Sequence, residues 1–332
     1  MKFNMLDKFF PLYLTVFFTT LILTALTVRR LTPRLSRSAQ QPIYSDGPAW
    51  HEVKHGTPTM GGLAFLFAIG ISLLISSLLL IAVGERESGV SLLSVTLFSV
   101  LNSSVGVIDD ITKLKRKKNK GLSPLQKLLI QFLIAAAFVT VRAILSDEVG
   151  EIFFSFGRVN LGFMYYPISI FLLLGIINCA NLTDGIDGLA TSVAFAAAVS
   201  LFYISASLFP DTSLVCSAVI GAAVGFLIFN INPAKIFMGD TGSLFFGALL
   251  SSAVFSMKNP FIILFVGGVY VIEGVSVVLQ VIFFKTTGRR VFKMAPIHHH
   301  LEKCGFSENR ICIIAILATL IFSIPAFIFY LP

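Results

Sequence analysis

The stretch MGGLAFLFAIGISLLISSLLLIAV, residues Met60–Val83, contains no charged side chain. As an α-helix rising about 1.5 Å per residue, it is long enough to cross the ~30 Å hydrocarbon core of a lipid bilayer. A strand of a membrane β-barrel would alternate apolar and polar residues over about ten positions, and this stretch shows no such alternation. It therefore predicts a membrane-spanning helix.

Similar runs recur along the chain. Its 332 residues are 56% apolar and only 13% charged, against roughly 25% charged residues in soluble domains. This composition excludes a water-soluble fold, and we predict an all-α integral membrane protein. Residues 1–332 would form a single polytopic transmembrane catalytic domain with about ten transmembrane helices. The predicted spans are Phe9–Val28, Met60–Val83, Val90–Ile108, Leu125–Leu145, Phe163–Asn178, Leu189–Phe209, Leu214–Phe229, Gly242–Met257, Phe261–Phe284 and Ile311–Leu331.

Most of the 25 Lys and Arg residues lie in alternate loops between these spans. Because basic loops stay on the cytoplasmic side of a membrane, both termini are predicted on the extracytoplasmic side. The net charge of +8 follows from basic residues beside helix ends, so we expect no nucleic-acid partner. The basic residues that decide the orientation are Arg29, Arg30, Arg34, Arg37, Lys54, Lys113, Lys115, Arg116, Lys117, Lys118, Lys120, Lys235, Lys285, Arg289, Arg290, Lys293, Lys303 and Arg310.

Aspartates gather at the ends of spans on the predicted cytoplasmic face. Asp109 and Asp110 end the third span, and Asp240 precedes the eighth. Carboxylates near a bilayer are costly unless they are paired, hydrated or metal-bound. Adjacent carboxylates also repel each other, which a hard cation such as Mg²⁺ relieves. A solvated helix cap beside Lys113 is the alternative, but the presence of Asp240 on the same face favours a metal or catalytic site.

Two loop motifs on this face combine polar groups with glycine. Asp184 and Asp187, in NLTDGIDGLA, are spaced to share one face of a helical turn. That arrangement suits a polar ligand or, equally, a series of helix N-caps. The segment KHGTPTMGG, which begins at Lys54, supplies a Lys and two Thr hydroxyls and suits a phosphate or nucleotide edge. Taken alone, it is better explained as a Gly/Pro turn that enters a helix.

The remaining polar features are three consecutive histidines and one intramembrane glutamate. Zinc is disfavoured for His298–His300, because adjacent side chains on a helix point apart and no Cys or carboxylate completes a familiar spacing. Contact of these imidazoles with a phosphate fits better. Glu273 lies midway along the ninth span, and we favour structural pairing of its buried charge over a proton relay.

The motifs are KHGTPTMGG (54–62), VIDD (107–110), KGLSPLQK (120–127), NLTDGIDGLA (181–190), FNINPAKIFMGDTGS (229–243) and APIHHHLE (295–302). Together they resemble the phospho-N-acetylmuramoyl-pentapeptide transferases, a branch of the polyprenyl-phosphate N-acetylhexosamine-1-phosphate transferase superfamily. The resemblance extends nearly from end to end. The Asp-Asp and Gly-Asp segments are common to the superfamily, whereas KHGTPTMGG and the triple His are specific to this branch.

The resemblance implies a ten-helix enzyme of the bacterial cytoplasmic (inner) membrane with its active site on the cytoplasmic face. Such an enzyme transfers phospho-MurNAc-pentapeptide from UDP-MurNAc-pentapeptide to undecaprenyl phosphate, giving lipid I and UMP, the first membrane step of peptidoglycan synthesis. The resemblance also implies Mg²⁺ as the cofactor, membrane lipids as partners and assembly as a homodimer.

Residue roles also follow from the resemblance. Asp240 would be the Mg²⁺ ligand, and Asp109 with Asp110 would lie beside the lipid phosphate. Asp109 would be a nucleophile that forms a covalent intermediate or a base for direct attack by undecaprenyl phosphate, and we favour direct attack. Phe237 would stack on uracil. The other expected contacts are Lys54, Thr59, Asn181, Asp184, Asp187 and Asn230 around the nucleotide, His298 and His299 as catalytic groups with His300 near the phosphosugar, and Lys113 and Lys127 at the lipid phosphate.

Two other functions compete with this hypothesis. A transferase that moves GlcNAc-1-phosphate onto the polyprenyl carrier would share the superfamily motifs, but KHGTPTMGG and the triple His argue against it. A secondary transporter or flippase would explain ten helices and Glu273. It would also place ionisable residues near the membrane midplane, where the sequence puts only Glu273.

Overall fold

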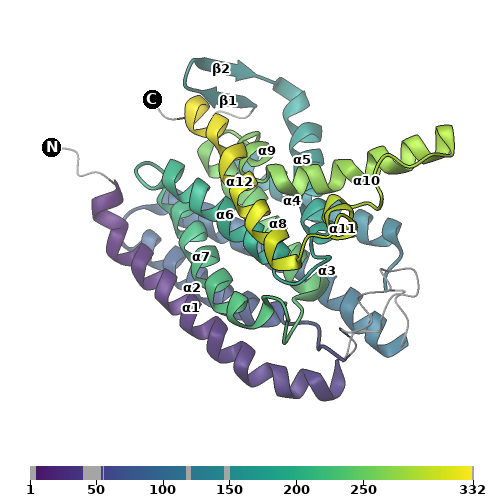
Figure 1. Cartoon of the computed structure of the whole chain (residues 1–332). Coiled ribbons are helices and arrows are strands. Elements are labelled where there is room, and N and C mark those ends of the chain that lie inside the picture. Colours follow the sequence, from purple (N-terminus) through teal and green to yellow (C-terminus); the bar gives the residue numbers. More distant parts are fainter. Residues whose placement is uncertain (1–4, 40–53, 55, 117–120, 146–149, 331–332) are drawn as a thin grey trace.

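The computed structural model describes residues 5–39, 54, 56–116, 121–145 and 150–330. Residues 117–120, which include three lysines of a predicted cytoplasmic loop, lie outside the described residues. The described chain is a helical bundle with one small sheet (Figure 1). Its elements are α1 (Met5–Ser38), α2 (Gly62–Ala82), α3 (Arg86–Arg116), α4 (Pro124–Ile144), β1 (Glu151–Phe154), β2 (Gly157–Asn160), η2 (Gly162–Met164), α5 (Tyr165–Thr183), α6 (Leu189–Ser205), α7 (Pro210–Asn230), α8 (Gly239–Ala253), η3 (Val254–Met257), α9 (Ile262–Val266), α10 (Gly268–Thr287), α11 (Ile297–Lys303) and α12 (Glu308–Tyr330).

Helices α7 and α8 form the centre of the bundle. Every side chain of α8 from Thr241 to Ala253 is buried. Helix α1 packs along α7, α3 and α5 pack on α8, and α6 lies between α7 and α12. Both central helices are rich in Gly, Ala and Ser. Small residues let membrane helices approach closely, and this allows the two helices to pack in the interior beside buried Phe226, Phe245 and Phe246.

The closest helix approaches occur at the first turn of α8. A Cβ atom on Gly62 of α2 would overlap the backbone of Gly242, and a Cβ on Gly106 of α3 would overlap the backbone of Asp240. Only glycine permits contacts this short. They place the last turns of α3 directly beside the N-terminus of α8.

The chain is an integral membrane protein. Eight helices in the described part are long and apolar enough to cross a membrane, namely α1, α2, α3, α4, α5 with η2, α7, α10 and α12. The predicted sixth and eighth spans correspond to the shorter helices α6 and α8, which are buried among the others. The predicted ninth span is divided at Gly267 into α9 and α10.

A two-stranded antiparallel hairpin departs from the all-α prediction. Strands β1 and β2 pair in register from Glu151 with Asn160 to Phe154 with Gly157. The hairpin lies in the loop between α4 and α5, beside the C-terminal end of α12 (Figure 1). Ser155 lies in the turn between the two strands, and its Oγ donates a hydrogen bond to the Ile328 carbonyl at 3.3 Å.

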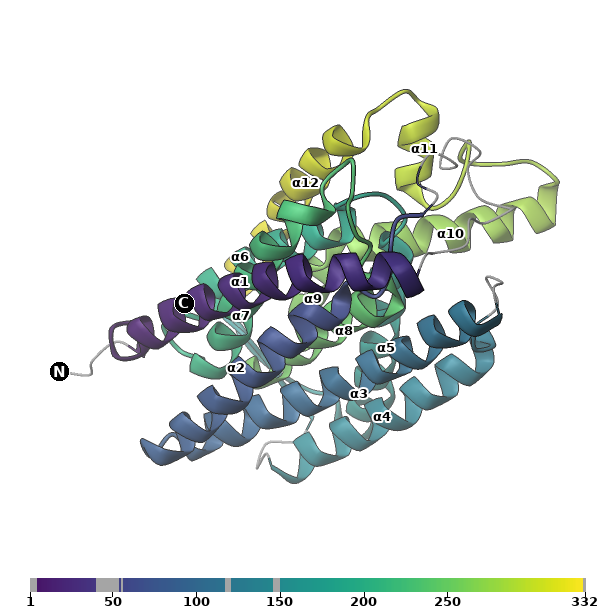
Figure 2. The ribbon, with the colours of Figure 1, turned by 90° about the horizontal axis from the view of Figure 1, so that it is seen from below.

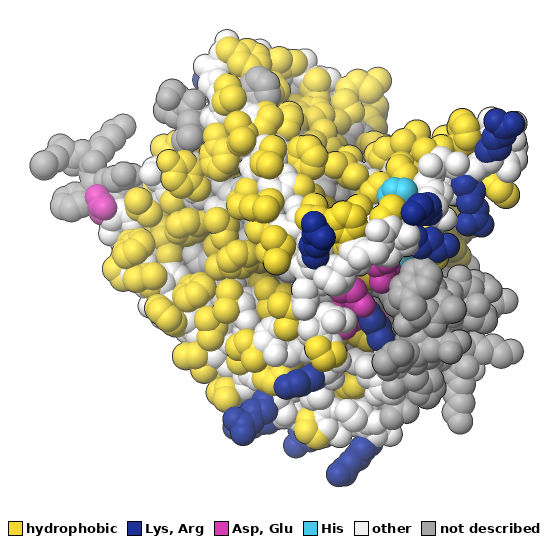
Figure 3. Space-filling model, in the orientation of Figure 1, with side chains coloured by type: hydrophobic (Ala, Val, Ile, Leu, Met, Phe, Trp, Pro, Cys, Tyr) yellow, Lys and Arg dark blue, Asp and Glu magenta, His cyan; other side chains and the backbone are white. Residues whose placement is uncertain are grey.

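Apolar and basic side chains occupy different parts of the face shown in Figure 3. In Figure 3, apolar side chains cover most of the visible face, and Lys and Arg gather along its lower and right edges. Figure 2 shows the first turns of α1 and the last turns of α12 extending toward the same side of the molecule, away from the protruding end of α10. Many large apolar side chains on α2, α4, α10 and α12 are exposed, as expected for helices that face lipid.

Candidate active site

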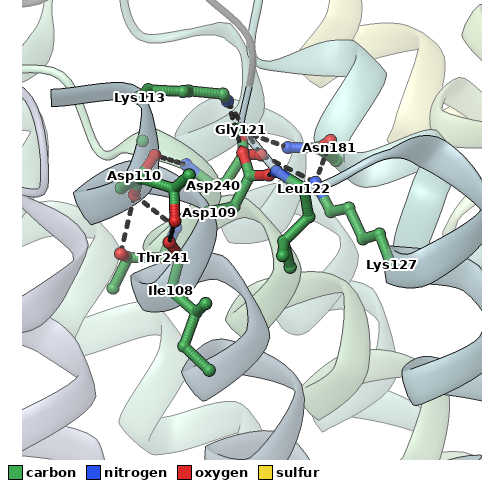
Figure 4. Close-up of polar contacts among 12 residues, drawn as sticks. Ile108, Asp109, Asp110, Lys113, Gly121, Leu122, Lys127, Asn181, Asp240 and Thr241 are labelled. Atoms are coloured by element: carbon green, nitrogen blue, oxygen red, sulfur yellow. Dashed lines mark hydrogen bonds and ion pairs between the residues drawn. The ribbon is translucent and has the colours of Figure 1, made fainter. Parts of the chain in front are cut away.

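Three aspartates converge where α3 ends and α8 begins. Asp109 and Asp110 lie in the last turns of α3, and Asp240 lies in the first turn of α8. One carboxylate oxygen from each falls within 4.8 Å of the others (Figure 4). The sequence placed these residues on one face, and the structure brings them into one site.

Asp110 caps the N-terminus of α8 from a neighbouring helix. Its carboxylate accepts hydrogen bonds from the Asp240 amide at 3.2 Å, the Thr241 amide at 2.9 Å and Thr241 Oγ1 at 2.7 Å. The first amides of a helix have no partner within it, so an acceptor here stabilises the helix end. Asp110 therefore fixes the position of the neighbouring carboxylate, Asp240.

Both oxygens of the Asp240 carboxylate accept hydrogen bonds. Oδ1 accepts one from Asn181 Nδ2 at 3.0 Å. Oδ2 is 2.7 Å from Lys127 Nζ and 3.1 Å from Lys113 Nζ. Asn181 also donates to Ser243 Oγ at 2.8 Å, which fixes its amide orientation. Four elements, α3, α4, α5 and α8, thus meet at one carboxylate (Figure 4).

Asp109 is held from the other side by the loop before α4. Lys113 Nζ lies 2.7 Å from its Oδ2, and the Leu122 amide donates to its Oδ1 at 2.7 Å. A Cβ on Gly121 would overlap the Asp109 carboxylate. Gly121 and Leu122 belong to the KGLSPLQK motif but were not predicted as site residues, because Leu122 contacts Asp109 through its backbone amide and not through its side chain.

The donor set fits a hard divalent cation. Three carboxylates face two ammonium groups, those of Lys113 and Lys127, so the cluster retains an excess of negative charge. Carboxylate oxygens are the preferred ligands of Mg²⁺ and Ca²⁺. The group Asp109, Asp110 and Asp240 can therefore bind a metal ion.

A second ionic group, called the Lys54 group below, joins Lys54 to the carboxylates of Asp187 and Glu308. Lys54 Nζ lies 2.7 Å from Asp187 Oδ1 and 2.7 Å from Glu308 Oε2. Glu308 Oε2 also accepts from the Asp187 amide at 2.6 Å. Asp187 Oδ2 accepts from Asn232 Nδ2 at 3.0 Å and from the Ala234 amide at 2.9 Å. Lys54 and Asp187, both expected at the nucleotide, therefore hold loops together, and Glu308 joins them without having been predicted from the sequence.

Two more of the expected nucleotide contacts are engaged with the protein. The Asn230 side chain is buried, accepts from Thr191 Oγ1 at 3.0 Å and donates to the Ile236 carbonyl at 3.0 Å. Phe237 is partly exposed, and its backbone bonds to Pro58 and Gly61 hold the KHGTPTMGG segment against the α7–α8 loop. The Asn230 amide supports the loop, whereas Phe237 makes these contacts through its backbone and is partly exposed.

Asp184 and Thr59 lie on the same side of the bundle as the aspartate cluster. Asp184 follows α5, and among the described contacts its carboxylate has no hydrogen-bond donor. Burial raises the pKa of the Asp184 carboxyl well above its usual range, and the negative charges of Asp240, Asp110 and Asp187 raise it further. The Thr59 side chain is buried beside Gly239, which precedes Asp240.

The three histidines of α11 have three different environments. His298 is fully buried, and its Nδ1 lies 3.0 Å from Glu273 Oε2 of α10. His299 Nδ1 lies 2.6 Å from Glu302 Oε2. His300 Nδ1 accepts from the Lys293 amide at 3.1 Å. The preference for structural pairing of Glu273 is confirmed, with His298 as its partner.

Comparison with known proteins matches the segments of the chain that contain the aspartate cluster and Lys54. The model of glycosyl transferase family 4 matches residues 92–258, and signature 1 of phospho-N-acetylmuramoyl-pentapeptide-transferase matches residues 54–66. The chain is 41% identical over 283 residues to the phospho-N-acetylmuramoyl-pentapeptide-transferases of Bacillus thuringiensis (strain Al Hakam) and Bacillus cereus (strain AH187). Each alignment covers 82% of this chain and 83% of the relative.

Proposed function

The chain belongs to the phospho-N-acetylmuramoyl-pentapeptide-transferase family, and on that premise we propose that it transfers phospho-MurNAc-pentapeptide from UDP-MurNAc-pentapeptide to undecaprenyl phosphate. The products are lipid I and UMP. One observation carries the proposal: three carboxylates and two lysines converge at the end of a membrane helical bundle. Such a site can receive a nucleotide from water and a phosphate from the membrane.

Asp240, supported by Asp109 and Asp110, would hold Mg²⁺. When bound, Mg²⁺ stabilises negative charge on the pyrophosphate of the donor. Asn181 and Asp110 fix Asp240 from two sides, and this preorganisation keeps its oxygens in place without the metal.

Asp109 would act as the base. It would accept the proton of undecaprenyl phosphate at a carboxylate oxygen, and the freed phosphate oxygen would attack the donor directly. Lys113 and Lys127 would receive the lipid phosphate as point charges, since both ammonium groups already lie within 3.1 Å of Asp240. A covalent intermediate on Asp109 is the alternative route.

The donor would bind on the side of Asp184 and Phe237. Asp184 has a carboxylate without a hydrogen-bond donor among the described contacts, and the Phe237 ring is partly exposed, which suits stacking on uracil. Lys54, Thr59, Asp187 and Asn230 would shape this pocket. His298, His299 and His300 would lie toward the phosphosugar.

We further infer a location in the bacterial cytoplasmic membrane, with the site on the cytoplasmic face, both termini on the opposite face and a homodimeric assembly. The Lys and Arg side chains along the lower and right edges of Figure 3 support the orientation, because basic segments stay in the cytoplasm.

The test is UMP release by the purified protein in detergent with undecaprenyl phosphate and Mg²⁺. UDP-MurNAc-pentapeptide and UDP-GlcNAc are supplied separately, with an Asp240→Ala variant and a chelator as controls. Release from the muramoyl donor alone, abolished by both controls, supports the proposal. Release from UDP-GlcNAc would instead assign transfer of GlcNAc-1-phosphate to the polyprenyl carrier. No release from either donor would overturn the transferase function.

A further inference from the structure

Glu273 and His298 form a buried pair between the protruding helix α10 and the short helix α11. The Glu273 carboxylate is 3% exposed, and its Oε2 accepts from His298 Nδ1 at 3.0 Å and from the His298 amide at 3.4 Å. A carboxylate is only an acceptor, so Nδ1 carries the proton of the imidazole. Glu273 thereby selects the ring tautomer and the ring orientation.

The other ring nitrogen of His298 faces Gly185. Nε2 is buried and has no hydrogen-bond partner among the residues that the structure describes. A Cβ on Gly185 would overlap Nε2, so the imidazole lies directly against the backbone of the loop that joins α5 to α6. A buried polar atom without a partner is costly, so its presence in a native protein requires an explanation such as strain, a functional role or a bound ion.

The same loop carries Asp184, whose carboxylate also lacks a hydrogen-bond donor among the described contacts. The far end of the loop is held separately, because the Asp187 amide donates to Glu308 and the Asp187 carboxylate binds Lys54. His298 therefore contacts the loop at Gly185, next to Asp184, whereas the Lys54 group holds the loop at Asp187.

We propose that Glu273 is a positioning residue, which holds His298 against Gly185 and so fixes the Asp184 end of the donor-binding loop. This inference rests on the proposed function, in which Asp184 lies beside the UDP-sugar donor. Glu273 itself lies in α10 and makes no contact with the aspartate cluster in the described structure. Its loss should therefore weaken donor binding more than it slows the chemical step.

The experiment measures KM for UDP-MurNAc-pentapeptide and kcat separately, by UMP release, in five variants. Glu273→Ala should raise KM about tenfold and change kcat by less than about threefold, the pattern of lost ground-state binding. Glu273→Gln keeps an acceptor oxygen for Nδ1–H and should recover most of the loss. Glu273→Ala combined with His298→Ala should be no worse than His298→Ala alone, since both act through one contact.

Ser276→Ala is the matched control. Ser276 is buried one turn along α10, and its hydroxyl donates only to the Glu273 carbonyl in the described structure. It should keep the wild-type KM. If Glu273→Ala does not fold, Gly185→Ala replaces it, because the added methyl group would displace His298 and should raise KM in the same way.

Distinct outcomes separate the two proposals. An unchanged KM in Glu273→Ala, additive effects in the double variant, or equal losses in Ser276→Ala would each overturn the positioning role. A wild-type protein that releases no UMP from either donor would overturn the proposed function instead. In that case the thermal stabilisation of each variant by UMP alone decides the role of Glu273. Equal stabilisation of all variants, or no stabilisation of any variant, overturns the positioning role.

Discussion

The aspartate cluster and the Lys54 group are both ionic, yet they differ in what their carboxylates face. Asp240 faces the ammonium groups of Lys113 and Lys127, and Asp109 faces Lys113 together with the Leu122 amide. The carboxylate of Asp187 binds Lys54, the Asn232 side chain and a backbone amide from the α7–α8 loop, so both of its oxygens are committed to loops. Ammonium groups on lysine side chains can be displaced by a metal or a phosphate more readily than backbone amides can leave a folded loop. Because Asp240 faces two of them, we expect the aspartate cluster to exchange partners on ligand binding, whereas the Lys54 group holds loops in place.

The largest effect should come from Asp240. Asp240→Asn keeps the size of the side chain and removes the charge that Lys113 and Lys127 face. We expect UMP release to fall by at least about a thousandfold, since metal-assisted charge stabilisation amounts to several kcal/mol, and Mg²⁺ binding measured by calorimetry to be lost. Glu87→Gln makes the same charge change at the opposite, exposed end of α3 and should leave both measurements unchanged. Wild-type Mg²⁺ affinity in Asp240→Asn would contradict the metal assignment.

A smaller loss should follow from Gly121→Ala. The new methyl group overlaps the Asp109 carboxylate and must move it, and a displacement of about 1 Å at a reacting group costs on the order of a hundredfold. The measurement is kcat for UMP release. Gly70→Ala is the control, because a Cβ at Gly70 meets no atom within 4 Å. If both variants keep full kcat, Asp109 does not depend on the loop before α4.

Glu308→Gln should act more weakly and on a different parameter. It breaks the ion pair with Lys54 and keeps an oxygen for the Asp187 amide. Both partners are partly exposed, so solvent screening limits the effect to about 1 kcal/mol. We expect KM for the donor to rise about fivefold with kcat preserved. A fall in kcat with KM unchanged would show that the Lys54 group serves the chemical step.

The smallest effect should come from the ion pair between Lys8 and Glu85, at the end of α1 far from the cluster. Lys8 is 43% exposed, and an exposed pair contributes roughly 0–1 kcal/mol. Glu85→Gln should therefore leave kcat unchanged and lower the thermal midpoint in detergent by no more than about 2 °C. A larger fall in the thermal midpoint would mean that the Lys8–Glu85 ion pair contributes more to stability than an exposed pair normally does.

Much of the membrane fold could be predicted from hydropathy alone. Runs such as Met60–Val83 match helices closely, because a bilayer requires each spanning segment to be apolar and to satisfy its own backbone. The glycine pairs of the ninth span, with Glu273 among them, indicated a kink, and the span is divided at Gly267. The β1–β2 hairpin was not predicted. It depends on packing against distant segments, which a short window of the sequence does not reveal.

For the site, the sequence identified Asp109, Asp110 and Asp240 correctly as neighbours. It could not rank the polar residues around them. Asp184 and Asp187 share a motif and a spacing, yet one carboxylate lacks a donor among the described contacts and the other accepts three hydrogen bonds. His298, His299 and His300 likewise look equivalent in sequence and have three different partners.

The sequence by itself determined that this chain is a membrane bundle with acidic motifs at helix ends, because apolar length and the cost of intramembrane charge are local properties. Only the tertiary structure decided which acid caps a helix, which faces exchangeable lysines and which holds a loop. Hydrogen bonds such as those from Thr241 to Asp110, or from Leu122 to Asp109, join residues that come together only when α3, α4 and α8 pack.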